Sequence, residues 1–187
     1  MSEPEDDFDL VGEIRGVARL TDAAVVIVSV STLEDWLEKA LKSRMRPLTS
    51  EVEHRLFTGY GPLNSFAAKI DIAYALGFFE RDTYNDLRAL KDIRNAFAHT
   101  SDFIFFDSAS LTPLFQRLTG WTKDSDPKIL FKERTNACVE PFKKILGMAA
   151  LLKALREYKP VSNTTDGRKT IIGSVADEPT TSTEKSE

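Results

Sequence analysis

Apolar residues recur at helical spacing along most of the chain, and no segment alternates between apolar and polar residues as a half-buried strand would. The pattern is clearest in residues 62–99, which read PLNSFAAKIDIAYALGFFERDTYNDLRALKDIRNAFAH. It predicts two helices, with Gly77 ending the first in a left-handed conformation and Asp82 starting the second. The first helix is apolar nearly all round, so we expect it to be central and buried. Its only charges, Lys69 and Asp71, must reach water or find partners.

The second helix of this hairpin is amphipathic. One face carries the apolar residues Leu87, Leu90, Ile93 and Phe97. At about 100° per residue, the other face carries the polar residues Arg88, Asp92, Asn95 and His99. Arg94 breaks the pattern because it projects from the apolar face, where an unpaired guanidinium would cost several kcal/mol. We therefore expect a buried ion pair between Arg94 and Asp71 that joins the two helices.

The residues before the hairpin predict three more helices. The first is short and covers residues 8–19, and Thr21 with Asp22 can cap a second, long helix that runs to Arg46. A short third helix is expected over residues 50–57. The apolar stripe of the long helix keeps helical spacing for several turns through Val26, Val30, Leu33, Leu37 and Leu41.

A basic cluster closes the long helix. It consists of Lys39, Lys42, Arg44 and Arg46. Cations near a helix C-terminus are stabilised by the helix dipole, and this electrostatic role is our first interpretation of the cluster. A patch that contacts phosphate groups is the alternative.

The residues after the hairpin continue the helical pattern. The segment DFIFFD at 102–107 predicts either a brief extended piece or a connector that packs phenylalanines onto the core. Residues 110–118 predict a helix. Asp126, followed by proline, is a strong start for a long last helix, in which Pro141 forces a kink or a break. The stripe of that helix contains Cys138, Phe142, Ile145, Ala149 and Leu152.

These elements define the expected architecture. Residues 1–7 are predicted to be a disordered acidic terminus, residues 8–159 a helical domain, and residues 160–187 a disordered polar tail. The fold class is all-α, a compact multi-helix bundle around a central antiparallel helical hairpin.

The composition limits the classes of function that are expected for this chain. The net charge is −4, so the chain lacks the general basic character of many nucleic-acid binders. The single cysteine permits no internal disulfide and is expected to be a core thiol in a reducing cytoplasm. The acidic first residues do not resemble a secretory signal, and the longest apolar run is too short to span a bilayer. Two distant histidines give no zinc spacing, so we expect no metal and no cofactor.

The hairpin residues resemble a known family. GPLNSFAAKIDIAYALGF followed by DLRALKDIRNAFAH closely resembles the signature of the mannitol operon repressor family of bacterial proteins. The resemblance implies an all-helical intracellular regulator of sugar-alcohol uptake genes that lacks an ordinary DNA-binding motif and forms a homo-oligomer, a dimer. We therefore expect action through a protein or nucleic-acid partner rather than direct sequence-specific DNA binding. No membrane partner is expected.

The same hairpin also resembles the motif of the HEPN superfamily, an arginine and a histidine separated by four residues. In this chain the motif consists of Arg94, followed by Asn95, and His99. In ribonuclease members the resemblance would make His99 the general acid or base and Arg94 the group that stabilises phosphate charge, with two copies meeting in a dimer. On a regular helix the two residues lie about 140° apart. We therefore favour a non-enzymatic regulator, with a dimeric metal-independent ribonuclease as the alternative.

Overall fold

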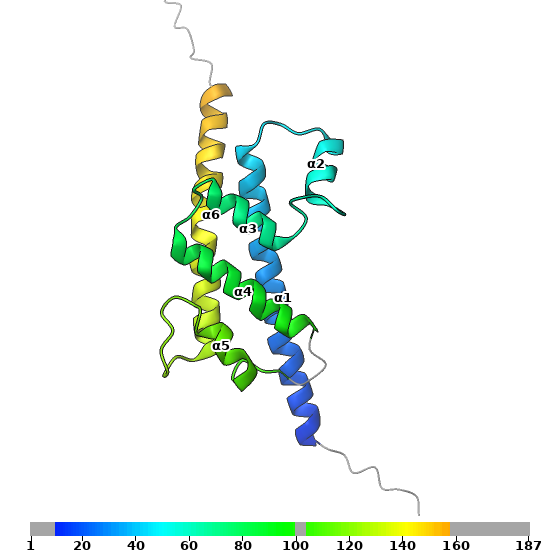
Figure 1. Cartoon of the computed structure of the whole chain (residues 1–187), viewed down its shortest axis with the longest axis vertical. Helices are drawn as coiled ribbons and strands as arrows, with labels where there is room; N and C mark the ends of the chain where they lie inside the picture. Colours follow the sequence, from blue (N-terminus) through cyan, green and yellow to red (C-terminus); the bar gives the residue numbers. More distant parts are fainter. Residues whose placement is uncertain (1–9, 100–103, 158–187) are drawn as a thin grey trace, which may run out of the picture. The chain divides into compact units, whose positions relative to one another are not determined.

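The computed structural model describes residues 10–99 and 104–157, and within these ranges its regular elements are helices (Figure 1). They are α1 (Leu10–Arg44), α2 (Ser50–Phe57), α3 (Phe66–Ala75), α4 (Arg81–His99), the 3-10 helix η1 (Ala109–Leu111), α5 (Thr112–Phe115) and α6 (Pro127–Glu157). The prediction of an all-α bundle is confirmed. Contacts group Met1–Arg156 into one unit and Glu157–Glu187 into another, and we describe the first. The predicted disordered termini, 1–7 and 160–187, lie outside the described residues.

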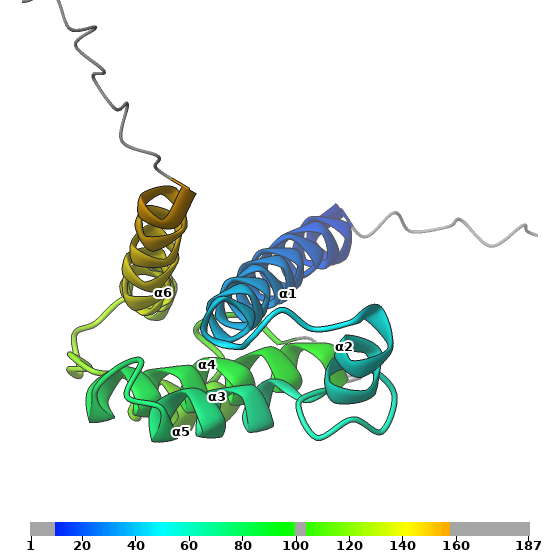
Figure 2. The same cartoon turned by 90° about the horizontal axis from the view of Figure 1, so that it is seen from above.

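The predicted hairpin, α3 and α4, lies against α1. Contacts join α1 to α4, α3 to α4 and α1 to α3. Seen from above, α3, α4 and α5 lie in one layer, and α1 and α6 lie on the same side of it (Figure 2). Gly77 ends the hairpin's first helix with φ 71°, as predicted, and the amide of Phe78 donates to the carbonyl of Ala73 over 3.0 Å. The hairpin is therefore covered by the long first helix.

The core includes the apolar stripe predicted for α1 and the apolar face predicted for α4. The stripe of α1 and the apolar face of α4 are both buried, with 0% exposure at Val26, Val30, Leu33, Leu37, Leu41, Leu87, Leu90 and Ile93. Cys138 of α6 is 1% exposed, and burial raises the pKa of its thiol. The structure thus confirms these two stripes and the core position of the cysteine, whereas Leu152, expected in the stripe of the last helix, is 44% exposed.

Two predictions about α1 and α3 are wrong in detail. The start expected at Thr21 falls inside α1, where the Thr21 hydroxyl donates to the carbonyl of Val17 over 2.9 Å instead of capping a helix. The first hairpin helix is not buried all round: Ile72 is 38% exposed and Leu76 is 55% exposed. The reason is geometric, because α3 packs on α1 and α4 but leaves its other side open.

The elements after the hairpin agree more closely with the prediction from the sequence. The carboxylate of Asp126 accepts hydrogen bonds from the amides of Lys128 and Ile129, so the predicted N-cap of the last helix is confirmed. Pro141 lies inside α6, which continues to Glu157. In the connector, the ring of Phe106 is buried, with its centroid 5.5 Å from the ring centroid of Phe131. The helix expected at 110–118 is present as the shorter elements η1 and α5.

One helix among the described residues has the length and apolarity that could cross a membrane, Gly16–Arg44 of α1, whose most apolar window of 18 residues has a mean hydropathy of 1.5 and is 18% buried. A core helix of a globular protein meets the same two criteria. In this structure, α1 packs one face against α3 and α4.

The turn between α2 and α3 depends on a close backbone approach. A Cβ atom at Gly61 would lie 2.5 Å from the carbonyl oxygens of Arg55 and Leu56. We expect Gly61→Ala to lower the free energy of unfolding by about 1–3 kcal/mol, the usual range for overpacking. Gly147→Ala is the control, because Gly147 is an exposed position of α6 with no atom within 4 Å of the added Cβ, and we expect a gain of about 0.5–1 kcal/mol.

Urea unfolding followed by circular dichroism measures both variants. Equal effects at the two positions would contradict the close approach at Gly61.

Candidate functional site

A buried lysine lies at the centre of the polar groups that join the helices. The side chain of Lys69, on α3, is 6% exposed. Its ammonium group lies 2.8 Å from a carboxylate oxygen of Glu34 and 2.7 Å from one of Glu38, both on α1. Burial alone would lower the pKa of Lys69, but the hydrogen bonds and charges of the two glutamates outweigh burial and raise this pKa. The lysine is therefore held in its charged form.

The pairing extends from α1 to α2. Lys42 lies 2.7 Å from a carboxylate oxygen of Glu38 and 2.6 Å from one of Glu53. Burial favours the neutral form of Glu38, but hydrogen bonds from Lys42 and Lys69 outweigh it, and the pKa of Glu38 is lowered. We call this set of paired charges, Glu34, Glu38, Lys42, Glu53 and Lys69, the ionic cluster.

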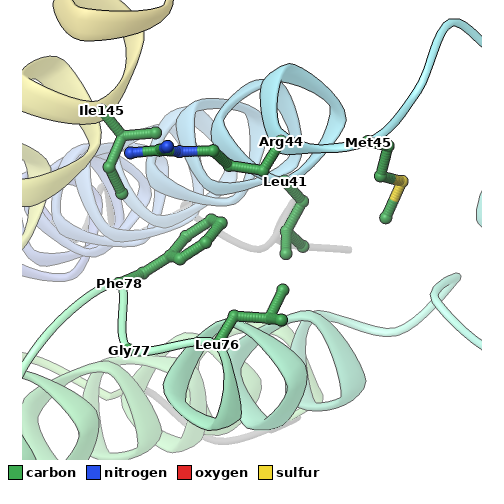
Figure 3. A pocket seen from close by; sticks show the side chains of 7 residues that line it. All are labelled: Leu41, Arg44, Met45, Leu76, Gly77, Phe78 and Ile145. Atoms are coloured by element: carbon green, nitrogen blue, oxygen red, sulfur yellow. The ribbon is translucent and has the colours of Figure 1, made fainter.

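The residues of the predicted basic cluster differ in what they contact. Lys42 belongs to the ionic cluster, and Lys39 lies 5.9 Å from the ring centroid of Trp36. Arg44 instead lines an open hollow of about 380 Å³ whose other lining residues are Leu41, Met45, Leu76, Gly77, Phe78 and Ile145 (Figure 3). Arg46 is exposed and does not line this hollow. The four cations therefore have different surroundings.

The expected ion pair between Arg94 and Asp71 is wrong. Asp71 is on the exposed side of α3, where it accepts hydrogen bonds from Arg88 over 3.1 Å and from the hydroxyl of Tyr84 over 3.0 Å. Arg94 turns toward α1, with a guanidinium nitrogen 3.9 Å from a carboxylate oxygen of Glu34. The two predicted partners thus belong to different sides of the hairpin.

The four residues of the predicted polar face have separate environments. Arg88 pairs with Asp71, and Asp92 lies 2.8 Å from both Lys91 and Arg117. His99 is exposed at the end of α4. Asn95 lines a second hollow. The four residues therefore lie on one face of α4, but each has its own partners or surroundings.

This second hollow, which we call the polar hollow, is where several candidate residues meet. It has a volume of about 380 Å³. Its lining comes from α1, from the start of α3 and from α4, and consists of Glu34, Asn64, Ser65, Phe66, Ala67, Lys91, Arg94 and Asn95. Arg94 and Asn95, both singled out from the sequence, are brought together here, whereas His99 is not among the lining residues.

The remaining lining residues were not anticipated. Ser65 caps α3, its hydroxyl accepting a hydrogen bond from the amide of Ala68 over 3.2 Å. A serine just before an apolar helical run is an N-cap signal, so this position was detectable from the sequence. Glu34, Asn64 and Lys91 come from three separate segments, and no local pattern links them. In the part of the chain that the structure describes, no group of three or more histidine, cysteine, aspartate or glutamate residues could hold a metal ion.

Similarity to known proteins extends over most of the chain. A family model described as the mannitol repressor matches residues 24–145, which is more than half of the chain. No curated protein matches it. Among solved structures, the chain is similar to one described as the X-ray structure of the MtlR-HPr complex from Escherichia coli. The two chains share 18% sequence identity with a TM-score of 0.45, and the match covers 70% of this chain and 87% of that chain.

The ionic cluster gives a stability prediction. Lys69→Met is expected to lower the free energy of unfolding by about 3–5 kcal/mol, because the variant leaves two carboxylates without their shared cation. Lys143→Met removes an exposed partner of Glu140 and should change stability by less than about 1 kcal/mol. Urea unfolding provides both values, and similar losses for the two variants would show that the cluster does not stabilise the fold.

The lowered pKa of Glu38 gives a pH dependence. A carboxyl group whose folded pKa lies below its usual value of 4.5 adds stability above pH 4.5, and this stability is lost as the pH falls through the lowered pKa. We expect the free energy of unfolding to fall less steeply between about pH 5 and pH 3 in Glu38→Gln than in the wild type. Urea unfolding across this pH range is the measurement, and identical slopes would contradict the prediction.

Proposed function

The chain belongs to the mannitol repressor family, and from this membership we propose that it is a non-enzymatic bacterial regulator that represses sugar-alcohol uptake genes in the cytoplasm. The family match over residues 24–145 is the observation that carries the proposal. We propose further that the protein acts by associating with other macromolecules, without an ordinary helix-turn-helix.

The surroundings of α4 support this mode of action. In a helix-turn-helix, the second helix offers side chains to base edges. The apolar face of α4 is part of the core, with 0% exposure at Leu87, Leu90 and Ile93. On its polar face, the carboxylate of Asp92 binds Lys91 and Arg117. Because one face of α4 packs in the core and the other forms ion pairs, the helix offers few side chains to DNA. The net charge of −4 adds no general attraction to phosphate groups.

Exposed apolar residues support association with proteins. The outer face of α1 exposes Val17 by 64%, Leu20 by 68% and Val28 by 64%. The end of α6 exposes a second stripe, made of Met148, Leu151, Leu152 and Leu155. Contiguous exposed apolar surface commonly marks a protein interaction site. These faces suit a homodimer and a protein partner, and HPr, named in the E. coli complex, is the first partner to test.

The arrangement of Arg94 and His99 does not favour the ribonuclease alternative. Arg94 lies beside Glu34 and lines the polar hollow, whereas His99 lies at the exposed end of α4, outside that hollow. A general acid or base must be within hydrogen-bond reach of the reacting group that the arginine stabilises. Within one chain, the two side chains do not form such a pair.

The proposal predicts the effect of losing the protein. Deleting its gene is expected to raise the transcripts of sugar-alcohol uptake genes in cells grown without sugar alcohol, because the repressor is absent. Quantitative reverse-transcription PCR measures this rise, and expression of the wild-type chain should reverse it. A double variant, Leu151→Glu with Leu155→Glu, places charge on the apolar stripe of α6 and should fail to restore repression.

Ile129→Glu is the matched control, because Ile129 is an exposed apolar residue of the same helix outside the stripe. Circular dichroism establishes that the variants are folded. Unchanged transcripts in the deletion strain would overturn the regulatory proposal. Cleavage of single-stranded RNA by the wild type and not by His99→Ala, in the presence of a chelator, would establish the ribonuclease instead.

A further inference from the structure

The polar hollow contains hydrogen-bond donors that the described residues do not use. Arg94 makes no hydrogen bond to a described residue, its closest carboxylate oxygen is 3.9 Å away on Glu34, and its Nε is buried without a partner. The side-chain amide of Asn95, which is half-buried in the same lining, also makes no hydrogen bond within the described residues. A guanidinium carries five N–H donors, so a ligand with acceptor oxygens suits this site.

The charges that line the hollow favour an anion. Lys91 and Arg94 supply two positive charges, and Glu34 supplies one negative charge. Glu34 is already bound to Lys69 over 2.8 Å, so much of its charge is compensated from the other side. Lys91 keeps an ion pair with Asp92, which Arg117 shares. Arginine and lysine together are suited to a phosphate group, whose oxygens accept several charge-assisted hydrogen bonds.

The rest of the lining suits hydroxyl groups. The amide nitrogen of Asn64 donates to the carbonyl of Gly59 over 2.7 Å, which leaves its side-chain oxygen as an acceptor. The hydroxyl oxygen of Ser65 accepts from the amide of Ala68, which leaves its proton as a donor. With Asn95, the lining of the hollow presents both donors and acceptors in addition to the cationic groups. Its volume of about 380 Å³ lies in the range of roughly 300–1,000 Å³ that small-molecule sites occupy.

We propose that the polar hollow binds a phosphorylated polyol, with the phosphate at Lys91 and Arg94 and the hydroxyl groups at Asn64, Ser65 and Asn95. The proposal rests on the regulatory function proposed above, because such a ligand is the chemical class that an effector of sugar-alcohol genes would have.

Isothermal titration calorimetry of the full chain tests the ligand. The probes are mannitol 1-phosphate, mannitol and inorganic phosphate. We expect mannitol 1-phosphate to bind more tightly than either of the other two, because only this probe carries both a phosphate group for the cationic residues and hydroxyl groups for the polar ones. Asn95→Ala and Lys91→Gln should each weaken its binding by about tenfold or more, the scale of a lost hydrogen bond to a charged or polyol group.

Arg88→Gln is the charge-matched control. It removes one positive charge from the same helix, but Arg88 pairs with Asp71 on the exposed side of α3 and does not line the hollow. Its affinity for mannitol 1-phosphate should stay within about twofold of the wild type. Thermal unfolding of each variant shows that it is folded.

Two results would overturn this inference. The first is no binding of mannitol 1-phosphate to the folded wild-type chain. The second is binding that inorganic phosphate matches and that Asn95→Ala leaves unchanged, since the hydroxyl groups would then play no part. The transcript measurement does not depend on either titration. If the protein represses transcription but does not bind mannitol 1-phosphate, the ligand proposal is wrong and the proposed regulatory function stands.

Discussion

The burial of Lys69 between Glu34 and Glu38 determines how the hairpin meets the first helix. A charged group at 6% exposure is stable only if opposite charges and hydrogen bonds compensate its loss of hydration. Its two partners lie four residues apart on α1 and thus share one face of that helix. The contact therefore fixes both the rotation of α3 and its position along α1. The start of α3 and the side chain of Arg94, which define the polar hollow, are placed by the same arrangement.

Much of the fold could be predicted because its determinants are local. The stripe of α1 and the apolar face of α4 follow the 3.6-residue period, and the cap at Asp126 and the left-handed Gly77 follow the chemistry of single residues. The choice of ion-pair partners could not be predicted in this way. Arg94 and Arg88 differ by six positions on one helix, and which of them meets Asp71 depends on how two helices are rotated about each other. The polar hollow has the same origin, because its lining combines three segments that only packing brings together.

The first helix carries apolar residues on more than one face. Its inner stripe contributes Val26, Val30 and Leu33 to the core, whereas Val17, Leu20 and Val28 remain largely exposed on the outer side. Packing of the core accounts for the apolar residues of the inner stripe. It does not account for the exposed apolar residues, because they do not contribute to the core. The same division occurs in α6, which buries Phe142 and exposes Leu151 and Leu155. Each of these two helices therefore contributes one face to the core and exposes apolar residues to the surface through which the proposed association would occur.

The shared lysine also constrains how this sequence can change over time. Replacing Lys69 leaves Glu34 and Glu38 without the cation that they share, and replacing either glutamate leaves Lys69 with one carboxylate in place of two. An apolar set of similar volume at all three positions can be tolerated there. The three positions are therefore expected to covary among related chains, either retained together or exchanged together. Substitution is expected to be least frequent at Glu38, because this residue pairs with both Lys42 and Lys69.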